Sequence, residues 1–463
     1  MSDDDVIERI RNSAEQAARD LAPPILTEQA IAQEFVDRNE SAVRFDHTVQ
    51  QWRVLNAGGR WVPDKTRAVF SWTRATVQSI ACDQPRRERM RLGSLKFARG
   101  VEGFAQTDQR IAVTRERWDC NGDIIGTPTG IVDLRSGEFF DPAPEEFITR
   151  AVAVDPDIAT DCPRWLRFLN DLTGNDDALK RFLQQYAGYA LTGSTVEQKL
   201  CFIHGPGGTG KSTFANTLLK IMSDYATGAA METFANSQFD GHPEQLARLD
   251  GARLVVANET EAGHRWRENR IKMMTGGDPI TARFMRENSF VFTPQFKLLL
   301  LGNHAPTITN LDTAIRRRFL IVPFVRKPAE PDFHLEEILA KEWPGILRWM
   351  IQGSVDWYSH GLILPKAVTE ATTLYFDEQD VFRQWLDECC DADPQNHHLV
   401  ERSVELFASW SAFAKRHGEE PGHQASFNQN LRARGFEVRQ LKQLGTRGCR
   451  GIRLKLQAED RYQ

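Results

Sequence analysis

The sequence predicts an α/β protein built around a phosphate-binding loop, with an α+β part before this core and a helix-rich module after it. The loop is Gly205-Pro206-Gly207-Gly208-Thr209-Gly210-Lys211-Ser212, which fits the pattern G-x-x-x-x-G-K-[ST] at every position. An apolar run at 200–203 predicts a strand entering the loop, and apolar residues at helical spacing predict a helix over 213–221 leaving it. Two further apolar strands, at 253–259 and 296–303, each end in a polar residue.

The composition is that of a globular protein with several domains. The chain has 463 residues, of which 41% are hydrophobic, so it can build more than one core. No run of eighteen apolar residues occurs, and the N-terminus Met1–Asp5 is acidic and polar. We therefore expect no transmembrane helix, no secretory signal and no membrane partner, and a cytoplasmic location.

The net charge and the spacing of the cysteines limit the kinds of DNA contact and metal site that we expect. The formal net charge is -5, so any contact with DNA must come from local basic patches and not from the overall field. The seven cysteines are scattered and form no C-x-x-C pair. We expect reduced thiols and no structural zinc.

The pattern of residues divides the chain into six expected parts. They are a helical segment (1–40), an α+β domain (41–155), a helical linker (156–195), the phosphate-loop domain (196–326), a helical extension (327–376) and a C-terminal module (377–463). In the first part we expect a helix over 26–35, with Thr27 as its cap and Ala30, Ile31 and Phe35 on its apolar side.

The phosphate loop predicts binding of ATP and Mg²⁺. Its glycines let backbone N–H groups turn toward phosphate oxygens at a helix N-terminus, so 205–213 is the expected nucleotide site. Lys211 would reach the β- and γ-phosphates, and the Ser212 hydroxyl would ligate Mg²⁺. The alternative is an ordinary glycine-rich turn.

Two strand ends after the loop carry candidate catalytic residues. Glu259 follows an apolar strand and could hold Mg²⁺ and orient the attacking water, with Glu261 as a helper; the alternative is a surface acid. Asn303 follows a second apolar strand and could bond the γ-phosphate and the water as a sensor; the alternative is a turn-forming Asn.

Two basic segments complete the candidate machinery. Arg316-Arg317-Arg318 precede an apolar strand, where one arginine could stabilise charge at a neighbouring subunit's γ-phosphate; the alternative is a solvated turn. Within residues 271–292, two strand-like runs flank the polar turn 287–289 and predict a β-hairpin, with Arg283 and Arg286 on its rising arm and Lys272 just before it. Such a hairpin could grip the backbone of a DNA strand, or it could be an ordinary surface hairpin.

This order of motifs closely resembles the superfamily 3 helicases, especially the phage and plasmid primase-helicases. The resemblance implies an AAA+-like ATPase core over 196–326, a homo-hexameric ring and 3′→5′ movement on single-stranded DNA. It also implies catalytic roles for Lys211, Glu259 and Asn303. Arg317 best matches the family's arginine finger, and Arg318 is second.

The resemblance extends upstream and covers roughly residues 40 to 330. The segments 129–138, 162–169 and 188–193 resemble the poxvirus-primase-type N-terminal domain that precedes such ATPases, although Thr129 stands where the family has Asn. Primases of this family carry a polymerase-like domain further upstream. Only about forty residues precede the resemblance here, so we expect this chain to lack primase activity and a separate primase or polymerase to act with it.

The C-terminal module reads as two helices, 403–413 and 426–436, followed by two strands. This order resembles the winged helix of the same phage proteins, and its basic face would bind duplex DNA. Packing or docking of a partner is the alternative. The basic residues include Arg432, Arg434 and Arg450, which we select as contacts, together with Arg439, Lys442, Arg447, Arg453 and Lys455.

The leading hypothesis is an ATP-driven DNA helicase of a phage or mobile-element replication system, acting on single-stranded and forked DNA in a bacterial cell. An alternative is an initiator or loader that binds origin DNA without unwinding it. A small-molecule kinase is disfavoured, because it would not need a basic hairpin or an arginine acting across subunits.

Overall fold

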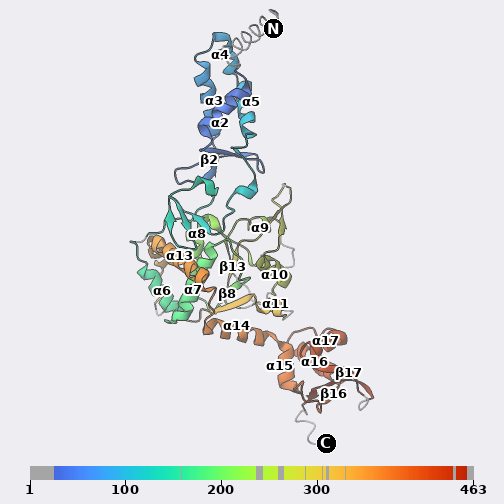
Figure 1. The fold of residues 1–463 in the computed structure, drawn as a ribbon. Coiled ribbons are helices and arrows are strands. Elements are labelled where there is room, and N and C mark those ends of the chain that lie inside the picture. Colours follow the sequence, from blue (N-terminus) through green and yellow to red (C-terminus); the bar gives the residue numbers. More distant parts are fainter. Residues whose placement is uncertain are drawn as a thin grey trace, which may run out of the picture.

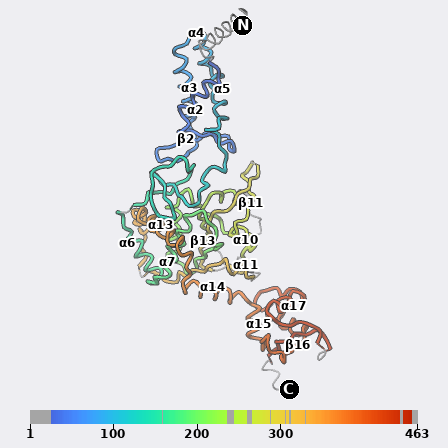
Figure 2. Tube along the Cα trace, viewed as in Figure 1, coloured from blue at the N-terminus to red at the C-terminus, as the bar shows by residue number. Residues whose placement is uncertain are grey.

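A computed structural model describes residues 26–157, 159–235, 243–258, 265–286, 288–304, 306–308, 312–328, 330–441 and 445–455. The chain is elongated (Figure 1). Helices α2 to α5 lie at one end, a sheet containing β8 and β13 lies in the middle, and α15 to α17 lie at the other end. The tube trace shows the same order, with α14 leading from the middle to the C-terminal part (Figure 2).

Helix α2 (Glu28–Asn39) begins the helical end. The Thr27 hydroxyl accepts a hydrogen bond from the Ala30 amide at 3.2 Å, which confirms the predicted cap. Ile31 and Phe35 are buried as predicted, but Ala30 is exposed. Ala30 lies outside the buried stripe, which is formed by residues 31, 32, 35 and 36.

A four-stranded sheet supports these helices. Its order is β3-β2-β1-β4, from β1 (Val43–Asp46), β2 (Gln51–Leu55), β3 (Trp61–Pro63) and β4 (Ala112–Val113). Strand-like runs at 44–46, 51–54 and 59–62 predict the first three strands. The helices that follow them were not predicted: α3 (Ala68–Ala81), α4 (Arg86–Leu92) and α5 (Leu95–Gln106). These helices share one buried cluster with α2 and the sheet, which includes Phe35, Phe45 and Phe97.

A second small sheet links this end to the middle of the molecule. It is antiparallel, in the order β5-β6-β7, from β5 (Ile124–Gly126), β6 (Ile131–Asp133) and β7 (Phe139–Phe140). Short 3-10 turns flank it: η1 (Arg115–Arg117) and η2 (Pro144–Glu146). The Tyr225 hydroxyl accepts a hydrogen bond from the Gly126 amide at 3.0 Å, which fastens β5 to the middle of the molecule.

The middle contains a five-stranded sheet in which every pairing is parallel. Its order is β14-β8-β13-β10-β9, from β8 (Leu200–His204), β9 (Ala226–Gly228), β10 (Leu254–Asn258), β13 (Lys297–Gly302) and β14 (Phe319–Pro323). Both faces are buried, because alternate β8 residues belong to different clusters: Cys201 and Ile203 to one, Leu200 and Phe202 to the other. Continuous apolar runs are typical of strands in such a sheet.

Helices cover the two faces. The first cluster takes residues from α6 (Pro163–Thr173), α7 (Asp177–Leu191), α8 (Lys211–Met222), α12 (Leu335–Lys341) and α13 (Trp343–His360). The second takes residues from α9 (Pro243–Ala247), α10 (Glu268–Gly276), α11 (Thr313–Arg316) and α14 (Lys366–Gln379). The expected helical linker 156–195 contains two helices, α6 and α7, because Gly174 ends α6 in a left-handed conformation with φ 66°. The turns η3 (Ser223–Tyr225) and η4 (Met231–Thr233) flank β9.

The predicted hairpin is present but shorter than expected. Strands β11 (Ile280–Ala282) and β12 (Phe290–Phe292) pair antiparallel over three residues each. Residues 271–276 belong to α10, which ends four residues before β11 begins, so Lys272 lies just before the hairpin, as expected, and on a helix. Arg283 and Arg286 lie in the connection between the strands and not on the rising arm.

The C-terminal part has its own core. It contains α15 (Val381–Cys389), α16 (Ser403–Arg416) and α17 (Gln424–Ala433), with Trp385, Trp410 and Phe427 buried together. Three strands pair in the order β16-β18-β17, from β16 (Val400–Arg402), β17 (Glu437–Leu441) and β18 (Thr446–Arg450). A two-stranded sheet joins β15 (Cys390–Ala392) to β19 (Ile452–Leu454). The sequence predicted the second and third helices but missed α15 and β16.

In the part of the chain that the structure describes, no helix is both long enough and apolar enough to cross a membrane.

Candidate functional site

The loops that carry the predicted nucleotide-site residues leave the same edge of the central sheet. His204 at the end of β8 is in register with Gly302 at the end of β13 and with Pro323 at the end of β14. Asn258, at the end of β10, pairs with Leu301. Because the strands are parallel, the connections after β8, β10 and β13 open side by side, where α/β sheets bind their ligands.

The phosphate loop runs from β8 to the first residue of α8, as predicted. Gly205 has φ 156°, and a Cβ atom there would lie 1.9 Å from the carbonyl oxygen of Phe324. Gly210 caps α8 with φ 86°, and a Cβ atom there would lie 2.8 Å from the Phe168 ring. Any larger side chain would therefore push the loop away from β14 and α6.

Lys211 brings the loop and the end of β13 together. Its Nζ atom donates to the carbonyl oxygens of Gly205 at 2.6 Å and Pro206 at 2.8 Å, and to Asn303 Oδ1 at 2.9 Å. The side chain is buried, and desolvation lowers the pKa of the Lys211 ammonium. This cation has three oxygen ligands and no carboxylate among the described residues that contact it.

The remaining loop residues lie around the start of α8. Thr209 is buried and donates from its hydroxyl to the Pro206 carbonyl at 3.0 Å, which fixes the turn. Ser212 is exposed at the second position of α8, and Thr213 is half-buried. Glu259 and Glu261 lie outside the described residues, directly after β10.

His204 is a neighbour of this site that the sequence reasoning missed. Burial lowers the pKa of its imidazole, and a hydrogen bond with the Asn303 backbone opposes that shift. The available signal was its position, since it is the last residue of the strand that leads into the loop. His204 therefore contacts the backbone of the same asparagine whose side chain contacts Lys211.

The three consecutive arginines lie in three different environments. Arg318 is buried and donates to Thr275 Oγ1 at 3.1 Å and to the Ala314 carbonyl at 2.7 Å. Arg316 lies over the Phe376 ring at 5.0 Å. Arg317 is exposed, and its guanidinium makes no hydrogen bond or ion pair with another described residue. The structure thus disfavours Arg318 as a residue that reaches another subunit, because its side chain is buried and its Nε and Nη1 atoms are bonded within the fold.

Arg317 lies at the end of the sheet where the central strands begin, whereas the phosphate loop lies at the end where they finish. It precedes β14, whose first residue, Phe319, is in register with Leu200 at the start of β8. The Lys199 ammonium donates to the Arg317 carbonyl at 2.6 Å. The five-residue strand β8 separates the two ends by roughly 16 Å, so the Arg317 side chain lies far from its own phosphate loop.

The connection between β11 and β12 presents an exposed basic and apolar group. Arg283, Phe284, Met285 and Arg286 are all exposed, and the two arginines have no hydrogen-bond or ion-pair partner among the described residues. The Phe284 ring stacks on Phe290, with ring centroids 5.7 Å apart. Lys272 differs, since it pairs with Asp312, the N-cap residue of α11.

The predicted DNA contacts in the C-terminal part also differ from one another. Arg434 pairs with Asp380 at 2.8 Å and lies over the Phe382 ring at 4.5 Å, so it holds α17 to α15 and is poorly available to a ligand. Arg450 lies 3.8 Å from Glu437. Arg432 is exposed but donates to the Val438 carbonyl at 3.3 Å.

Two other cations of this basic face are more accessible to a ligand. Arg447 and Arg453 are exposed and have no hydrogen-bond or ion-pair partner among the described residues. Lys442 lies outside the described part of the chain. Arg447 and Arg453 are therefore more accessible than Arg434 and Arg450, whose contacts with DNA remain predictions.

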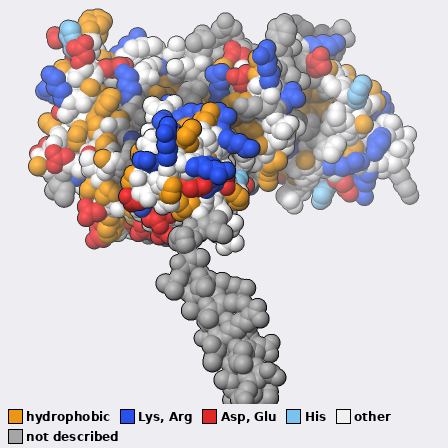
Figure 3. Space-filling view, turned by 90° about the horizontal axis from the view of Figure 1, so that it is seen from above, with side chains coloured by type: hydrophobic (Ala, Val, Ile, Leu, Met, Phe, Trp, Pro, Cys, Tyr) orange, Lys and Arg blue, Asp and Glu red, His pale blue; other side chains and the backbone are white. Residues whose placement is uncertain are grey.

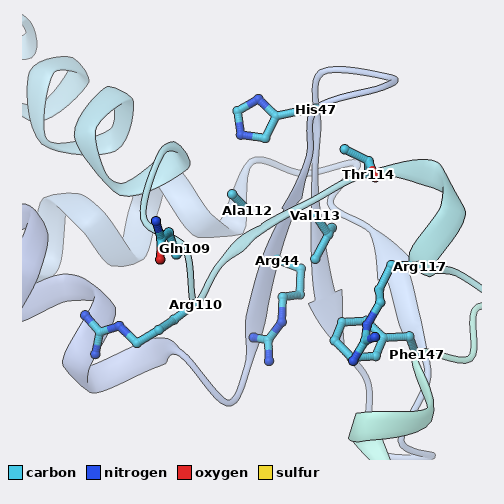
Figure 4. A pocket seen from close by; sticks show the side chains of 9 residues that line it. All are labelled: Arg44, His47, Gln109, Arg110, Ala112, Val113, Thr114, Arg117 and Phe147. Atoms are coloured by element: carbon cyan, nitrogen blue, oxygen red, sulfur yellow. The ribbon is translucent and has the colours of Figure 1, made fainter.

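A groove of about 490 Å³ lies away from the nucleotide site, beside β1 and β4. Figure 4 shows three arginines on its walls, Arg44, Arg110 and Arg117. Arg110 is neutralised by Asp37, Glu40 and Asp108, all within 3.1 Å. The Arg44 guanidinium donates to the carbonyls of Glu40 and Val43. The cations of this groove are largely used internally, so we assign it no ligand.

Comparison with known proteins agrees with this arrangement. Residues 32–174 match the family model described as "D5 N terminal like", and residues 203–318 match a "Family of unknown function (DUF5906)". The chain carries a D5 N terminal-like domain followed by a DUF5906 domain. The predicted resemblance to the primase-helicases is confirmed by this combination and by the viral relatives.

These relatives are described as helicases. The chain is 28% identical over 294 residues to "Putative helicase L207/L206" of Acanthamoeba polyphaga mimivirus, covering 58% of this chain and 30% of that protein. It is 26% identical over 269 residues to "Putative helicase 022R" of Frog virus 3 (isolate Goorha), covering 52% of this chain and 27% of that protein. The chain thus spans less than a third of these relatives.

A solved structure shares the overall fold. "The apo structure of NrS-1 C terminal region (305-718)" superposes with a TM-score of 0.51 at 13% identity, covering 93% of this chain and 100% of that chain. At this identity the likeness concerns the fold alone. The mixed α/β architecture with its parallel central sheet is therefore shared with that region.

Proposed function

We propose that the chain is an ATP-dependent DNA helicase of the superfamily 3 type. The observation that carries the proposal is the hydrogen bond between Lys211 and Asn303, which joins a phosphate loop to the polar end of a neighbouring parallel strand. A lysine that binds phosphate and an amide that orients water are needed at the same γ-phosphate. The viral relatives described as helicases support this reading.

In the proposed site, ATP lies along the phosphate loop with its phosphates at the N-terminus of α8. Lys211 would exchange the carbonyls of Gly205 and Pro206 for the β- and γ-phosphate oxygens. The exposed Ser212 hydroxyl and the carboxylate of Glu259 are suited to Mg²⁺, which prefers oxygen ligands. Bound Mg²⁺ would neutralise charge on the phosphates.

The proposed active site is completed by a second copy of the chain. Arg317 is exposed at the opposite edge of the sheet, so in a head-to-tail ring it can face the phosphate loop of the next subunit. Its planar guanidinium would stabilise charge on the γ-phosphate during cleavage. We propose a ring of six, with 3′→5′ movement, on the basis of the family resemblance.

DNA contacts are proposed at two places. Arg283 and Arg286, with Phe284 between them, would hold a single strand by its phosphates and by stacking on a base. In the C-terminal part, the order α15, β15, β16, α16, α17, β17, β18, β19 supports the proposal of a winged-helix-like module. There α17 would enter the major groove of duplex DNA, with Arg447 on the wing.

A strand-displacement assay tests the proposal directly. The protein should release the labelled strand of a forked DNA in the presence of ATP and Mg²⁺, and Lys211→Ala should abolish both release and ATP hydrolysis. ATP hydrolysis without strand release would favour the alternative, an initiator or loader that binds origin DNA. Hydrolysis that is indifferent to DNA would contradict both. The expected setting is a phage or mobile-element replication system in the bacterial cytoplasm.

A further inference from the structure

The helical end of the molecule carries a local excess of positive charge. Between Lys65 and Gln106 the chain has nine Lys and Arg and three Asp and Glu residues, a net charge of +6 (9 minus 3). The whole chain has a net charge of -5. This segment comprises α3, α4 and α5 and lies at the opposite end of the molecule from the C-terminal basic face (Figure 1).

These cations are exposed, and most of them have no counter-charge among the described residues. All nine Lys and Arg residues of the segment are exposed. Seven make no side-chain hydrogen bond or ion pair with another described residue: Lys65, Arg74, Arg86, Arg87, Arg89, Lys96 and Arg99. In the view onto this end of the molecule, Lys and Arg side chains gather on the face turned toward the viewer (Figure 3).

The placement of two of these arginines opposes the local preference of the helix. Arg86 and Arg87 occupy the first two positions of α4, where the helix dipole disfavours positive side chains. Arg89 follows within the same helix. Like charges so close together repel one another, so folding alone does not explain their concentration. They suit a polyanionic partner.

A groove lies next to these cations. It has a volume of about 240 Å³ and lies between α3 and the connection from α4 to α5. Phe70, Val77, Leu92 and Leu95 provide apolar walls, and Arg74 lies at its rim. Leu95 is 56% exposed, and the neighbouring Met90 is 72% exposed. Apolar surface between arginines suits an unstacked base, which a duplex does not present.

We propose that α3, α4 and α5 form a binding surface for single-stranded DNA. The arginines at the start of α4 would contact backbone phosphates, and the groove beside Arg74 would accept a base. The inference extends the proposed helicase function, because it gives the strand a contact beyond the β11–β12 connection. It concerns DNA affinity alone and does not depend on ATP cleavage.

The test is a titration of fluorescent oligothymidine with the full chain carrying Arg86→Glu and Arg87→Glu. Glutamate is favoured over arginine in the first turn of a helix, so these substitutions should not unfold α4. Loss of two phosphate contacts should reduce the affinity roughly 20-fold at 0.1 M salt and the magnitude of the salt slope by about 1.4. ATP hydrolysis without DNA should stay at the wild-type rate.

A matched variant controls for the change in net charge. Lys327→Glu with Lys366→Glu alters two exposed lysines outside the proposed surfaces by the same amount and should bind as the wild type does. Wild-type affinity and salt slope in the α4 variant would overturn the inference. The inference would also be overturned if the α4 variant had a changed molecular mass in solution but bound oligothymidine with unchanged affinity per assembly. The cations would then serve contacts between copies of the chain.

The result is separable from the proposed function. Lys211→Ala should lose ATP hydrolysis and keep the oligothymidine affinity of this surface. An inactive wild type that still binds DNA through α4 would contradict the helicase proposal alone.

Discussion

The guanidinium of Arg318 donates to the hydroxyl of Thr275, with 3.1 Å between Nε and Oγ1, and this contact ties the start of β14 to α10. The adjacent Arg317 points to solvent at the same sheet edge. Two neighbouring arginines thus have different tasks. One holds the fold together, and the other is available to a second molecule.

Stability measurements should separate these two arginines. Arg318→Met leaves the Thr275 hydroxyl and the Ala314 carbonyl without their donor, so the free energy of unfolding should fall by about 2 kcal/mol. Arg317→Ala should change it by less than about 0.5 kcal/mol, because the side chain is exposed. Urea denaturation of both variants measures this. If both substitutions lowered the free energy of unfolding equally, the assignment of different tasks to Arg318 and Arg317 would be wrong.

Asn303 should matter for the rate of ATP cleavage more than for binding. Its side chain contacts the lysine of the phosphate loop, so Asn303→Ala should lower kcat about 100-fold while the nucleotide affinity stays similar. Steady-state hydrolysis and binding of a fluorescent nucleotide give the two quantities. A variant with normal kcat would remove the sensor role.

Lys211 should make stability depend on pH in the alkaline range. Burial lowers its pKa in the folded protein, so the unfolded chain holds this proton at pH values where the folded chain has released it. The wild type should therefore gain stability relative to Lys211→Met as the pH rises toward the ordinary lysine pKa, near 10.4. Denaturation of both proteins at several pH values checks the sign. A difference that is constant with pH would contradict it.

The β11–β12 connection should contribute to the salt dependence of DNA binding. Arg283→Ala with Arg286→Ala should reduce the magnitude of the single-strand salt slope by about 1.4, since each lost phosphate contact removes about 0.7. Lys272→Ala is the control, because its ammonium already pairs with Asp312, and it should leave the slope unchanged. Equal slopes in all three proteins would exclude the connection as a DNA contact.

Much of the core was predictable because its signals are local. The phosphate loop has a fixed spacing, and β8, β10 and β13 are continuous apolar runs. The helix that carries Lys272 was not predicted, although burial of Ile271, Met274 and Thr275 follows helical spacing. Helix α3 was missed because β-branched and aromatic residues, which favour strands, occupy much of its sequence.

The sequence could not predict which arginines stabilise the fold and which are available to a ligand. Arg434 is held by Asp380, which lies 54 residues earlier, and Arg318 is held by Thr275, 43 residues earlier. Charge and local spacing are the same for a buried arginine and for an exposed one. Only the tertiary contacts separate Arg317, Arg447 and Arg453 from the arginines that stabilise the fold.

The most direct test of the shared active site is a mixing experiment with Lys211→Ala and Arg317→Ala. Each variant alone should hydrolyse ATP at least about 10³-fold more slowly than the wild type. In an equal mixture, random assembly of a head-to-tail ring pairs an intact lysine with an intact arginine at about one site in four, so roughly a quarter of the wild-type activity should return. Full activity of Arg317→Ala alone, or no recovery in mixed rings, would contradict the account.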